Sequence, residues 1–268
     1  MSLEQLCDLK SVLPTTSCTN FMDNKDQNLQ NFPYRLMPPV PGTPVLSHLG
    51  RKVNHGTTTV GFVYQGGIVL CADSRLCNGI NVCSQKMNKI VPISKHIVGT
   101  LAGGAADCKY WYRVLTRESR LHELRYKQPM SVSAAAKMIG NVSQMHRGTG
   151  LDMGMLLAGY GPKGPTLIYV DSEGMNISGK KFAVGSGASN ALGILDPMYC
   201  FDLSDEQAFE LALQCIYQAT LCDAYTGGIV LLYRMGPVTH GTVKEVDCME
   251  LHKKYSTYAL SQMDIDLE

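Results

Sequence analysis

The hydrophobic pattern of the chain changes abruptly near residue 56. Residues 18–31 are polar and rich in Asn and Asp, and residues 33–44 contain five prolines, which disfavour regular helix and most sheet pairing. From residue 57 onward the chain reads TTTVGFVY (57–64), then a Gln-Gly-Gly turn, then the apolar run IVLCA (68–72). Two such runs around a glycine-containing turn predict a β-hairpin. We therefore expect an extended segment, residues 1–56, ahead of a folded domain, residues 57–268.

The rest of the domain alternates between blocks of strands and blocks of helices. Four more runs are strand-like: 97–101, 153–158, 166–170 and 229–233. Three segments have helical patterns: 105–127, 131–146 and about 204–221, the last beginning at Ser204 and Gln207 with capping-box spacing. In the first helix the predicted apolar face consists of Trp111, Val114, Leu115, Leu121 and Leu124. This order is neither alternating βαβ nor all-β, and it predicts an α+β fold with antiparallel sheets covered by helices.

Composition supports this division of the chain. The 268 residues are 45% hydrophobic and 18% charged, which is within the globular range. The first 56 residues contain six of the 12 prolines but only three of the 26 glycines. The formal net charge of +1 provides no strong field to attract nucleic acid or an anionic membrane, so we expect neither as a partner.

Targeting, disulfide and metal signals are weak. No apolar run approaches the ~18 residues needed to span a bilayer, and the N-terminus carries Glu4 and Asp8 without the apolar core of a secretory signal. Because no CxxC or HExxH motif occurs, we expect no metal and no cofactor. The GSG at 185–187 is a weak nucleotide-binding signal, since Asn190 replaces the third glycine. Four cysteines within apolar runs are predicted to be reduced core thiols of a cytosolic or nuclear protein: Cys71, Cys108, Cys215 and Cys222.

The hairpin also predicts a pair of neighbouring side chains. Opposed residues in a hairpin have a constant sum of residue numbers, here about 130 to 132, which places Thr57 opposite Asp73 or Ser74. Taken alone, this pair is ordinary for a strand followed by a turn. If the Gly56–Thr57 bond is cut, however, Thr57 carries a hydroxyl nucleophile and an α-amine of pKa ~7.7–8.0, suited to a general base.

Six motifs occur in order: HGTTT (55–59), CADSR (71–75), GTLAGGAADC (99–108), YVDSEG (169–174), VGSG (184–187) and DAYTGG (223–228). With them, the chain from His55 to about Tyr255 resembles the proteasome beta subunits, which are N-terminal-nucleophile hydrolases, and most nearly the chymotrypsin-like type-5 kind. The resemblance implies a four-layer αββα sandwich of two antiparallel sheets flanked by helices. It also implies a threonine endopeptidase of ubiquitin-dependent protein catabolism. Such a subunit sits in stacked seven-membered rings with other alpha and beta subunits, in cytoplasm and nucleus, and acts on unfolded polypeptide.

The resemblance assigns catalytic roles to individual residues. Thr57 is the nucleophile, exposed by autolysis after Gly56, and residues 1–56 are a propeptide. Asp73 holds Lys89, whose charge lowers the pKa of the threonine amine and hydroxyl. The Gly103 N–H stabilises the oxyanion, a role that a Gly-Gly turn entering a helix also suggests on physical grounds. The cluster supporting the threonine amine consists of Ser186, Asp223 and Thr226, the last standing where the family usually has serine.

The resemblance also implies the substrate preference. It places five residues in the substrate-binding site: Leu76, Cys77, Met87, Leu101 and Ala105. Leu101 replaces a methionine of similar volume, so we expect cleavage after large apolar residues. Leu76 and Cys77 replace alanine and threonine, which suggests a diverged paralogue of altered preference. Two alternatives remain: a non-catalytic structural beta-ring subunit, and an N-terminal-nucleophile amidohydrolase acting on small molecules.

Overall fold

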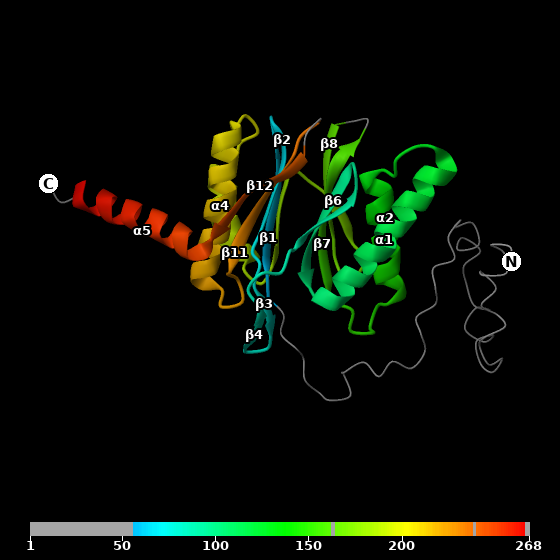
Figure 1. Cartoon of the computed structure of the whole chain (residues 1–268), viewed down its shortest axis with the longest axis horizontal. Helices are drawn as coiled ribbons and strands as arrows, with labels where there is room; N and C mark the ends of the chain where they lie inside the picture. The colour runs from blue at the N-terminus through cyan, green and yellow to red at the C-terminus, as the bar shows by residue number, and fades with distance from the viewer. Residues whose placement is uncertain (1–55, 162–163, 238–239, 266–268) are drawn as a thin grey trace. The chain divides into compact units, whose positions relative to one another are not determined.

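The computed structural model describes residues 56–161, 164–237 and 240–265 (Figure 1). Their strands form two five-stranded antiparallel sheets and one separate two-stranded sheet. The first sheet has the order β10 (Lys181–Gly185), β1 (Thr58–Tyr64), β2 (Gly67–Ala72), β11 (Ile229–Met235) and β12 (His240–Asp247). The second has the order β5 (Ile90–Ser94), β6 (Ile97–Gly103), β7 (Met153–Gly161), β8 (Gly164–Val170) and β9 (Asn176–Ser178). The two-stranded sheet consists of β3 (Leu76–Asn78) and β4 (Asn81–Ser84).

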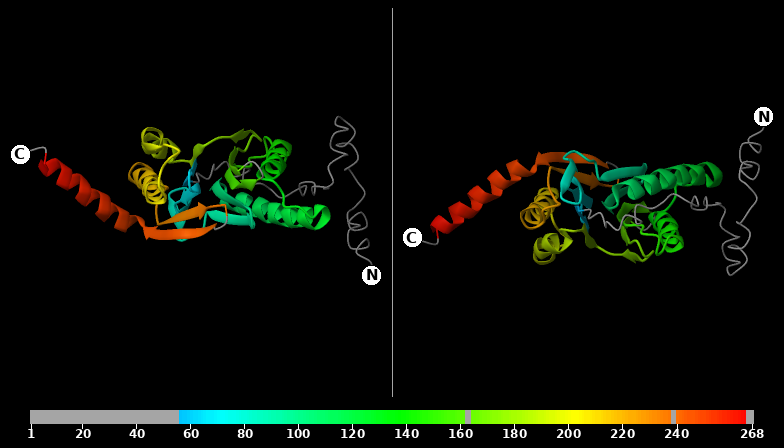
Figure 2. Two further views of the ribbon diagram at one scale, coloured as in Figure 1. Left: turned by 90° about the horizontal axis from the view of Figure 1, so that it is seen from above. Right: turned by 90° about the horizontal axis from the view of Figure 1, so that it is seen from below.

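Helices cover the outer face of each large sheet. Helices α1 (Ala105–Tyr126) and α2 (Val132–Met145) lie on the second sheet, and α3 (Ala188–Met198) and α4 (Asp205–Cys222) lie on the first. Seen from above and below, the two helix pairs lie on opposite sides of the sheets (Figure 2). Helix α5 (Cys248–Ile265) follows β12. The predicted α+β, four-layer αββα sandwich is therefore confirmed, and no helix within the described ranges is long and apolar enough to cross a membrane.

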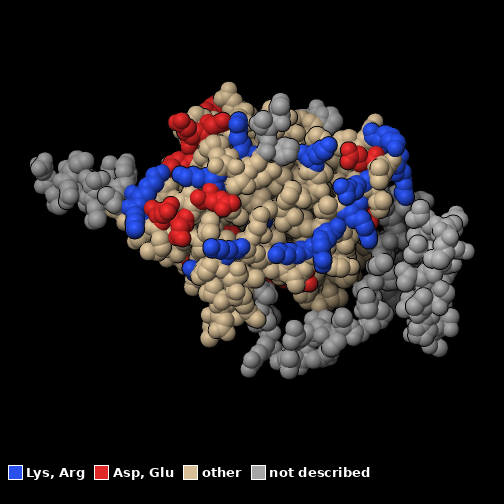
Figure 3. Space-filling model, in the orientation of Figure 1, with Lys and Arg blue, Asp and Glu red and all other residues tan. Residues whose placement is uncertain are grey.

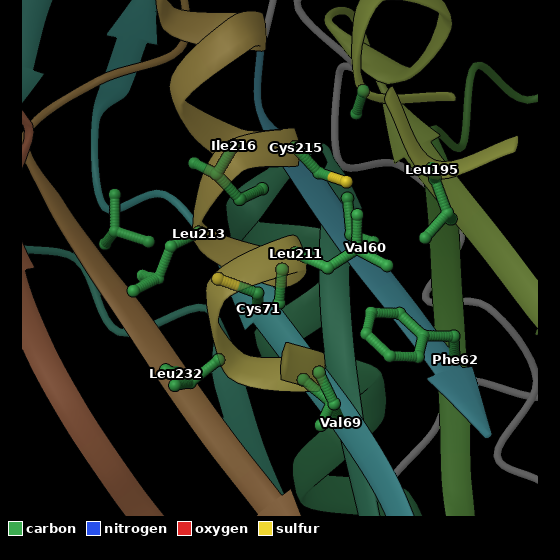
Figure 4. Packing of buried hydrophobic residues seen from close by; sticks show 14 of the residues in the cluster. Val60, Phe62, Val69, Cys71, Leu195, Leu211, Leu213, Cys215, Ile216 and Leu232 are labelled. Atoms are coloured by element: carbon green, nitrogen blue, oxygen red, sulfur yellow. The ribbon is translucent and has the colours of Figure 1, made fainter. Parts of the chain in front are cut away.

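The central strands β1 and β2 are buried on both faces. Side chains alternate between the faces of a strand, so Val60 and Phe62 point toward α3 and α4, in the cluster shown in Figure 4. Val63, which follows Phe62 and points to the opposite face, joins Ile68 and Leu70 of β2 in the layer between the two sheets. A strand with two apolar environments needs apolar residues at nearly every position, which explains the unbroken run that marked this hairpin in the sequence.

The structure confirms the strands and helices that the pattern predicted. The hairpin register pairs Thr59 with Ala72, a sum of 131 that lies within the expected range. Ser204 caps α4 in a complete capping box with Gln207. The pattern did not predict α3, which contains Pro197, or α5. Helix α5 begins next to Asp247, and the carboxylate of Asp247 accepts a hydrogen bond from the backbone N–H of Met249 at 2.8 Å.

The predicted apolar face of α1 is partly wrong. Leu121 and Leu124 are 42% and 61% exposed. The ring of Tyr112 turns inward instead, and its hydroxyl donates to the carbonyl of Thr100 at 2.6 Å. Gly99 leaves room for this ring, since a Cβ at that position would lie 2.4–2.6 Å from it. The contact rotates the helix, so that its buried residues are Cys108, Tyr112, Leu115, Glu118 and Ser119.

The cysteine prediction holds for three of the four core positions. Cys71, Cys108 and Cys215 are buried, but Cys222, at the last turn of α4, is exposed, which corrects that prediction. Burial raises the pKa of Cys108 and of Cys215 to about 12, so both remain protonated thiols near neutral pH. All eight cysteines within the described ranges are free.

Charge is unevenly distributed over the surface despite the small net charge. Basic side chains gather on the face that includes α1 (Figure 3), where the exposed residues are Lys109, Arg113, Arg117 and Arg120. The β3–β4 hairpin, by contrast, contains no charged residue, and Ile80 at its turn is 96% exposed.

Glu210, on α4, forms hydrogen bonds with residues in the first half of α5. Its carboxylate accepts hydrogen bonds from Lys254 Nζ at 2.6 Å and from the Tyr255 hydroxyl at 2.8 Å. Burial alone would raise the pKa of Glu210, but these hydrogen bonds outweigh it and the pKa is lowered from its ordinary 4.5. A lowered pKa contributes stability above the ordinary value and loses it as the pH falls through the lowered one.

We expect Glu210→Gln to speed hydrogen exchange of the amides at residues 249–256 about 2- to 5-fold at pH 7. The difference from the unaltered chain should shrink as the pH falls through the lowered pKa of Glu210, where that chain also loses its carboxylate. The exposed Glu206→Gln on the same helix is the matched control. Equal exchange in Glu210→Gln and the control would contradict the role of this contact.

Candidate active site

Thr57 and Asp73 meet at the open end of the β1–β2 hairpin, as the register predicted. Thr57 immediately precedes β1 and Asp73 immediately follows β2. The Thr57 hydroxyl Oγ1 donates to Asp73 Oδ1 at 3.0 Å, and the two residues are 4% and 0% exposed. A hydroxyl and a carboxylate are thus held together in a site screened from bulk water.

The Asp73 carboxylate also organises the surrounding backbone. Oδ1 accepts from the backbone N–H of Thr58 at 3.0 Å, and Oδ2 accepts from the N–H groups of Arg75 at 3.1 Å and Gly227 at 3.0 Å. These contacts tie together the hairpin and the turn that precedes β11. Sequence reasoning missed Thr58, Arg75 and Gly227 because their backbone groups, rather than their side chains, make the contacts.

Lys89 completes a buried triad with Thr57 and Asp73. It lies just before β5 and is 1% exposed, and its Nζ contacts Thr57 Oγ1 and donates to Asp73 Oδ1 at 2.7 Å. Burial lowers the pKa of Lys89, while the Asp73 carboxylate opposes that shift. The expected salt bridge is present, but desolvation outweighs it. The pKa of the Lys89 amine is therefore lower than its ordinary 10.5, while its Nζ stays in contact with Thr57 Oγ1 and Asp73 Oδ1.

A second polar cluster surrounds the backbone nitrogen of Thr57. This nitrogen donates to Ser186 Oγ at 3.2 Å, and Ser186 Oγ donates to Asp223 Oδ2 at 2.5 Å. Thr226 Oγ1 donates to the same carboxylate oxygen at 2.6 Å and lies 2.7 Å from Thr58 Oγ1. Ser186, which is far from Thr57 in sequence, is therefore brought to its nitrogen, and Asp223 and Thr226 extend the hydrogen-bonded chain behind it.

Gly56 and Gly103 occupy positions that only glycine fits. A Cβ on Gly56 would lie 1.9 Å from the Cβ of Tyr225. Gly103 ends β6 with φ +91°, and a Cβ there would lie 2.8 Å from the carbonyl oxygen of Asp152. Gly103 and Thr57 share the wall of a pocket of about 260 Å³. The described residues lining it are Thr57, Ala102, Gly103, Asp152, Met153, Gly154, Tyr169, Ser172, Val184, Gly185 and Ser186.

Comparison with known proteins identifies the family. The family described as "Proteasome subunit" matches residues 53–235 of the chain. The chain belongs to this family. It is 45% identical to proteasome subunit beta type-5 of Gallus gallus over 206 residues, 77% of this chain and 80% of that one. It is 50% identical to the probable beta type-5 subunit of Schizosaccharomyces pombe over 193 residues, 71% of each. Proteasome subunit beta type-8 of Rattus norvegicus is 42% identical over 204 residues, 76% of this chain and 74% of that one.

The five predicted substrate-binding residues of this proteasome subunit come from β3, from the segment before β5, from β6 and from the start of α1. Leu76 and Cys77 are on β3, and the Met87 N–H donates to the Ser74 carbonyl at 2.9 Å. Leu101, on β6, is buried and donates its N–H to the carbonyl of Lys89 at 3.0 Å, and Ala105 begins α1. None of the five is among the described residues that line the 260 Å³ pocket, so their role in binding substrate stays a prediction.

The GSG segment serves Thr57 in this proteasome subunit. Gly185 has φ +110°, and a Cβ there would lie 2.0 Å from the Thr57 carbonyl oxygen. A Cβ on Gly187 would lie 2.3 Å from Thr58 Oγ1. Both glycines are therefore needed for close backbone packing around the threonine, which accounts for the motif without a nucleotide. Within the described ranges, no group of three or more His, Cys, Asp or Glu is placed to hold a metal ion.

Proposed function

We propose that this proteasome subunit is a threonine endopeptidase whose nucleophile is Thr57, after removal of residues 1–56. The observation that carries the proposal is the buried contact of Thr57 Oγ1 with both Lys89 Nζ and Asp73 Oδ1. The Thr57 nitrogen is held at the same time by Ser186 Oγ. One residue thus offers a hydroxyl and a nitrogen, each with its own set of polar partners.

The first reaction is the release of residues 1–56. Thr57 Oγ1 attacks the carbonyl carbon of Gly56, and collapse of the tetrahedral adduct breaks the bond to the Thr57 nitrogen, which leaves an ester. Water hydrolyses that ester, so that residue 56 ends in a carboxylate and Thr57 gains a free α-amine. Gly56 suits this step because a side chain there would collide with Tyr225.

Peptide cleavage then uses the same groups. The α-amine takes the hydroxyl proton as Oγ1 attacks the substrate carbonyl, with Lys89 stabilising the developing oxygen charge. The Gly103 N–H is the proposed donor to the oxyanion. The protonated amine next gives its proton to the departing amine of the substrate, and water hydrolyses the remaining acyl ester. Ser186, Asp223 and Thr226 keep the threonine nitrogen in position.

The relatives named beta type-5 support the substrate class and setting. The subunit assembles with other alpha and beta proteasome subunits in stacked seven-membered rings, where it cleaves unfolded polypeptides in the cytoplasm and nucleus. Cleavage follows large apolar residues in a chymotrypsin-like manner, with buried Leu101 at the base of the binding site. Leu76 and Cys77 alter the preference relative to other type-5 subunits.

The direct test is the N-terminal sequence of the subunit in the assembled core particle. We expect Thr57 as the first residue, and any other N-terminus would overturn the proposal. We also expect Gly56→Ala to leave a larger share of subunits unprocessed, because its methyl group would lie within 2 Å of the Tyr225 Cβ. Gly56→Ala combined with Tyr225→Gly should restore processing, measured by intact mass; no restoration would show that this contact is not what slows the reaction.

A further inference from the structure

The 260 Å³ pocket beside Thr57 contains a carboxylate that the proposed mechanism does not use. Asp152 is the one charged residue among the described residues that line this pocket. The hydroxyl-bearing side chains of Tyr169, Ser172 and Ser186 line the same space. Pockets for drug-sized ligands span about 300–1,000 Å³, so this one suits a single amino-acid side chain.

The position of Ser186 shows which half of a substrate reaches this pocket, provided that the proposed function holds. The departing amine must take its proton from the Thr57 nitrogen, and the N–H of this nitrogen donates a hydrogen bond to Ser186 Oγ at 3.2 Å. Thr57 and Ser186 both line the pocket. Leu101, which is predicted to set the preference for the residue before the scissile bond, is not among the described lining residues. The pocket therefore faces the residue that follows the scissile bond.

The local field in this region is negative. A Cβ on Gly103 would lie 2.9 Å from Asp152 Oδ1, and a Cβ on Gly104 would lie 3.1 Å from Asp107 Oδ2. Burial raises the pKa of Cys108, and the carboxylates of Asp107 and Asp152 raise it further. The pKa of Tyr169 is likewise raised by burial, then by Asp171 and Asp152. No Lys or Arg is among the described residues that line the pocket with Asp152.

We propose that Asp152 makes this pocket selective for a basic side chain, Lys or Arg, at the first residue after the scissile bond. The cationic end pairs with the Asp152 carboxylate, while the aliphatic stem packs on Tyr169, Met153 and Val184 of the wall. The cation also offsets the charge of Asp152 beside Gly103, where negative charge opposes the oxyanion. The preference therefore acts on the chemical step as well as on binding.

The test uses core particles that contain the whole subunit, together with internally quenched peptides. All peptides share the same sequence before the scissile bond, which ends in Tyr or Leu, and they differ only in the first residue after that bond, which is Lys, Ala or Glu. Rates from Thr57→Ala particles are subtracted to isolate cleavage by this chain. We expect kcat/KM to fall in the order Lys, Ala, Glu, with about a 2- to 5-fold drop at each step, as for an ion pair with an exposed carboxylate such as Asp152. The order should flatten as the salt concentration rises.

Asp152→Asn and Asp152→Ser should each bring the Lys-to-Glu ratio close to one. Asp202→Asn, an exposed carboxylate outside the pocket, should keep the original ratio. A peptidyl aminocoumarin lacks the residue after the scissile bond and reports the proposed function alone. If particles with the unaltered subunit did not hydrolyse this aminocoumarin more than Thr57→Ala particles do, the proposed endopeptidase activity would be refuted. Normal hydrolysis with no Lys preference, or with a preference that both neutral variants retain, would refute the role of Asp152.

Discussion

Thr57→Ala is expected to abolish peptide cleavage by this subunit and to leave residues 1–56 attached. The change removes Oγ1, the atom that is proposed as nucleophile and that contacts Lys89 Nζ and Asp73 Oδ1. Removal of a catalytic nucleophile typically lowers kcat by a factor on the order of 10⁶. The measurement is hydrolysis of a peptidyl aminocoumarin ending in Tyr or Leu by assembled particles, together with the intact mass of the subunit.

Thr57→Ser is the matched control, because it keeps the hydroxyl and removes one methyl group. We expect it to retain processing and a substantial part of the rate. If cleavage after Tyr or Leu is the same in Thr57→Ala particles as in unaltered ones, the subunit has the structural, non-catalytic role instead. Retained processing in Thr57→Ala would show that another group releases residues 1–56.

Lys89→Met is expected to give the second largest loss, at least about 10²- to 10³-fold in kcat/KM, the usual effect of removing one preorganised donor. It deletes the cation beside Thr57 Oγ1 while keeping an apolar side chain of similar length. It also leaves the Asp73 carboxylate buried without its cation, which costs roughly 3–5 kcal/mol of stability when a buried pair is broken. Activity and thermal unfolding of the particle are both measured.

Two comparisons separate catalysis from stability. The exposed Lys86→Met, three residues earlier, should change neither activity nor unfolding. Adding Asp73→Asn to Lys89→Met removes the unpaired charge and should recover part of the stability without recovering the rate. If the double variant regained activity along with stability, Lys89 would act through the fold alone, contrary to the proposed role.

Local pattern predicted the hairpin, its register and the Thr57–Asp73 pair, because residues 57–73 form one continuous local unit. The other partners of Thr57 come from distant parts of the chain: Ser186 lies 129 residues away. No spacing rule reaches across that distance. Their assignment came from the resemblance to a family, and in the structure Ser186 accepts from the Thr57 nitrogen while Asp223 and Thr226 join it through the Asp223 carboxylate.

Predictions that depended on which face a helix presents were less reliable. The sequence of α1 contains two overlapping apolar stripes, and periodicity alone favoured the one with Leu121 and Leu124. Packing of Tyr112 over Gly99 selects the other. Cys222 fits an apolar helical run equally well, yet it lies on the exposed side of the last turn of α4.

The sequence by itself therefore determined the secondary structure of the hairpin and of the main helices, and the pairing of Thr57 with Asp73, since these depend on neighbours along the chain. Only the tertiary structure decided the burial that lowers the pKa of Lys89, the backbone donors around Asp73 and the pocket containing Asp152. The physical reason is the same for each. Desolvation and hydrogen-bond geometry arise from segments that meet when the two sheets pack face to face, and such meetings leave no local pattern in the sequence.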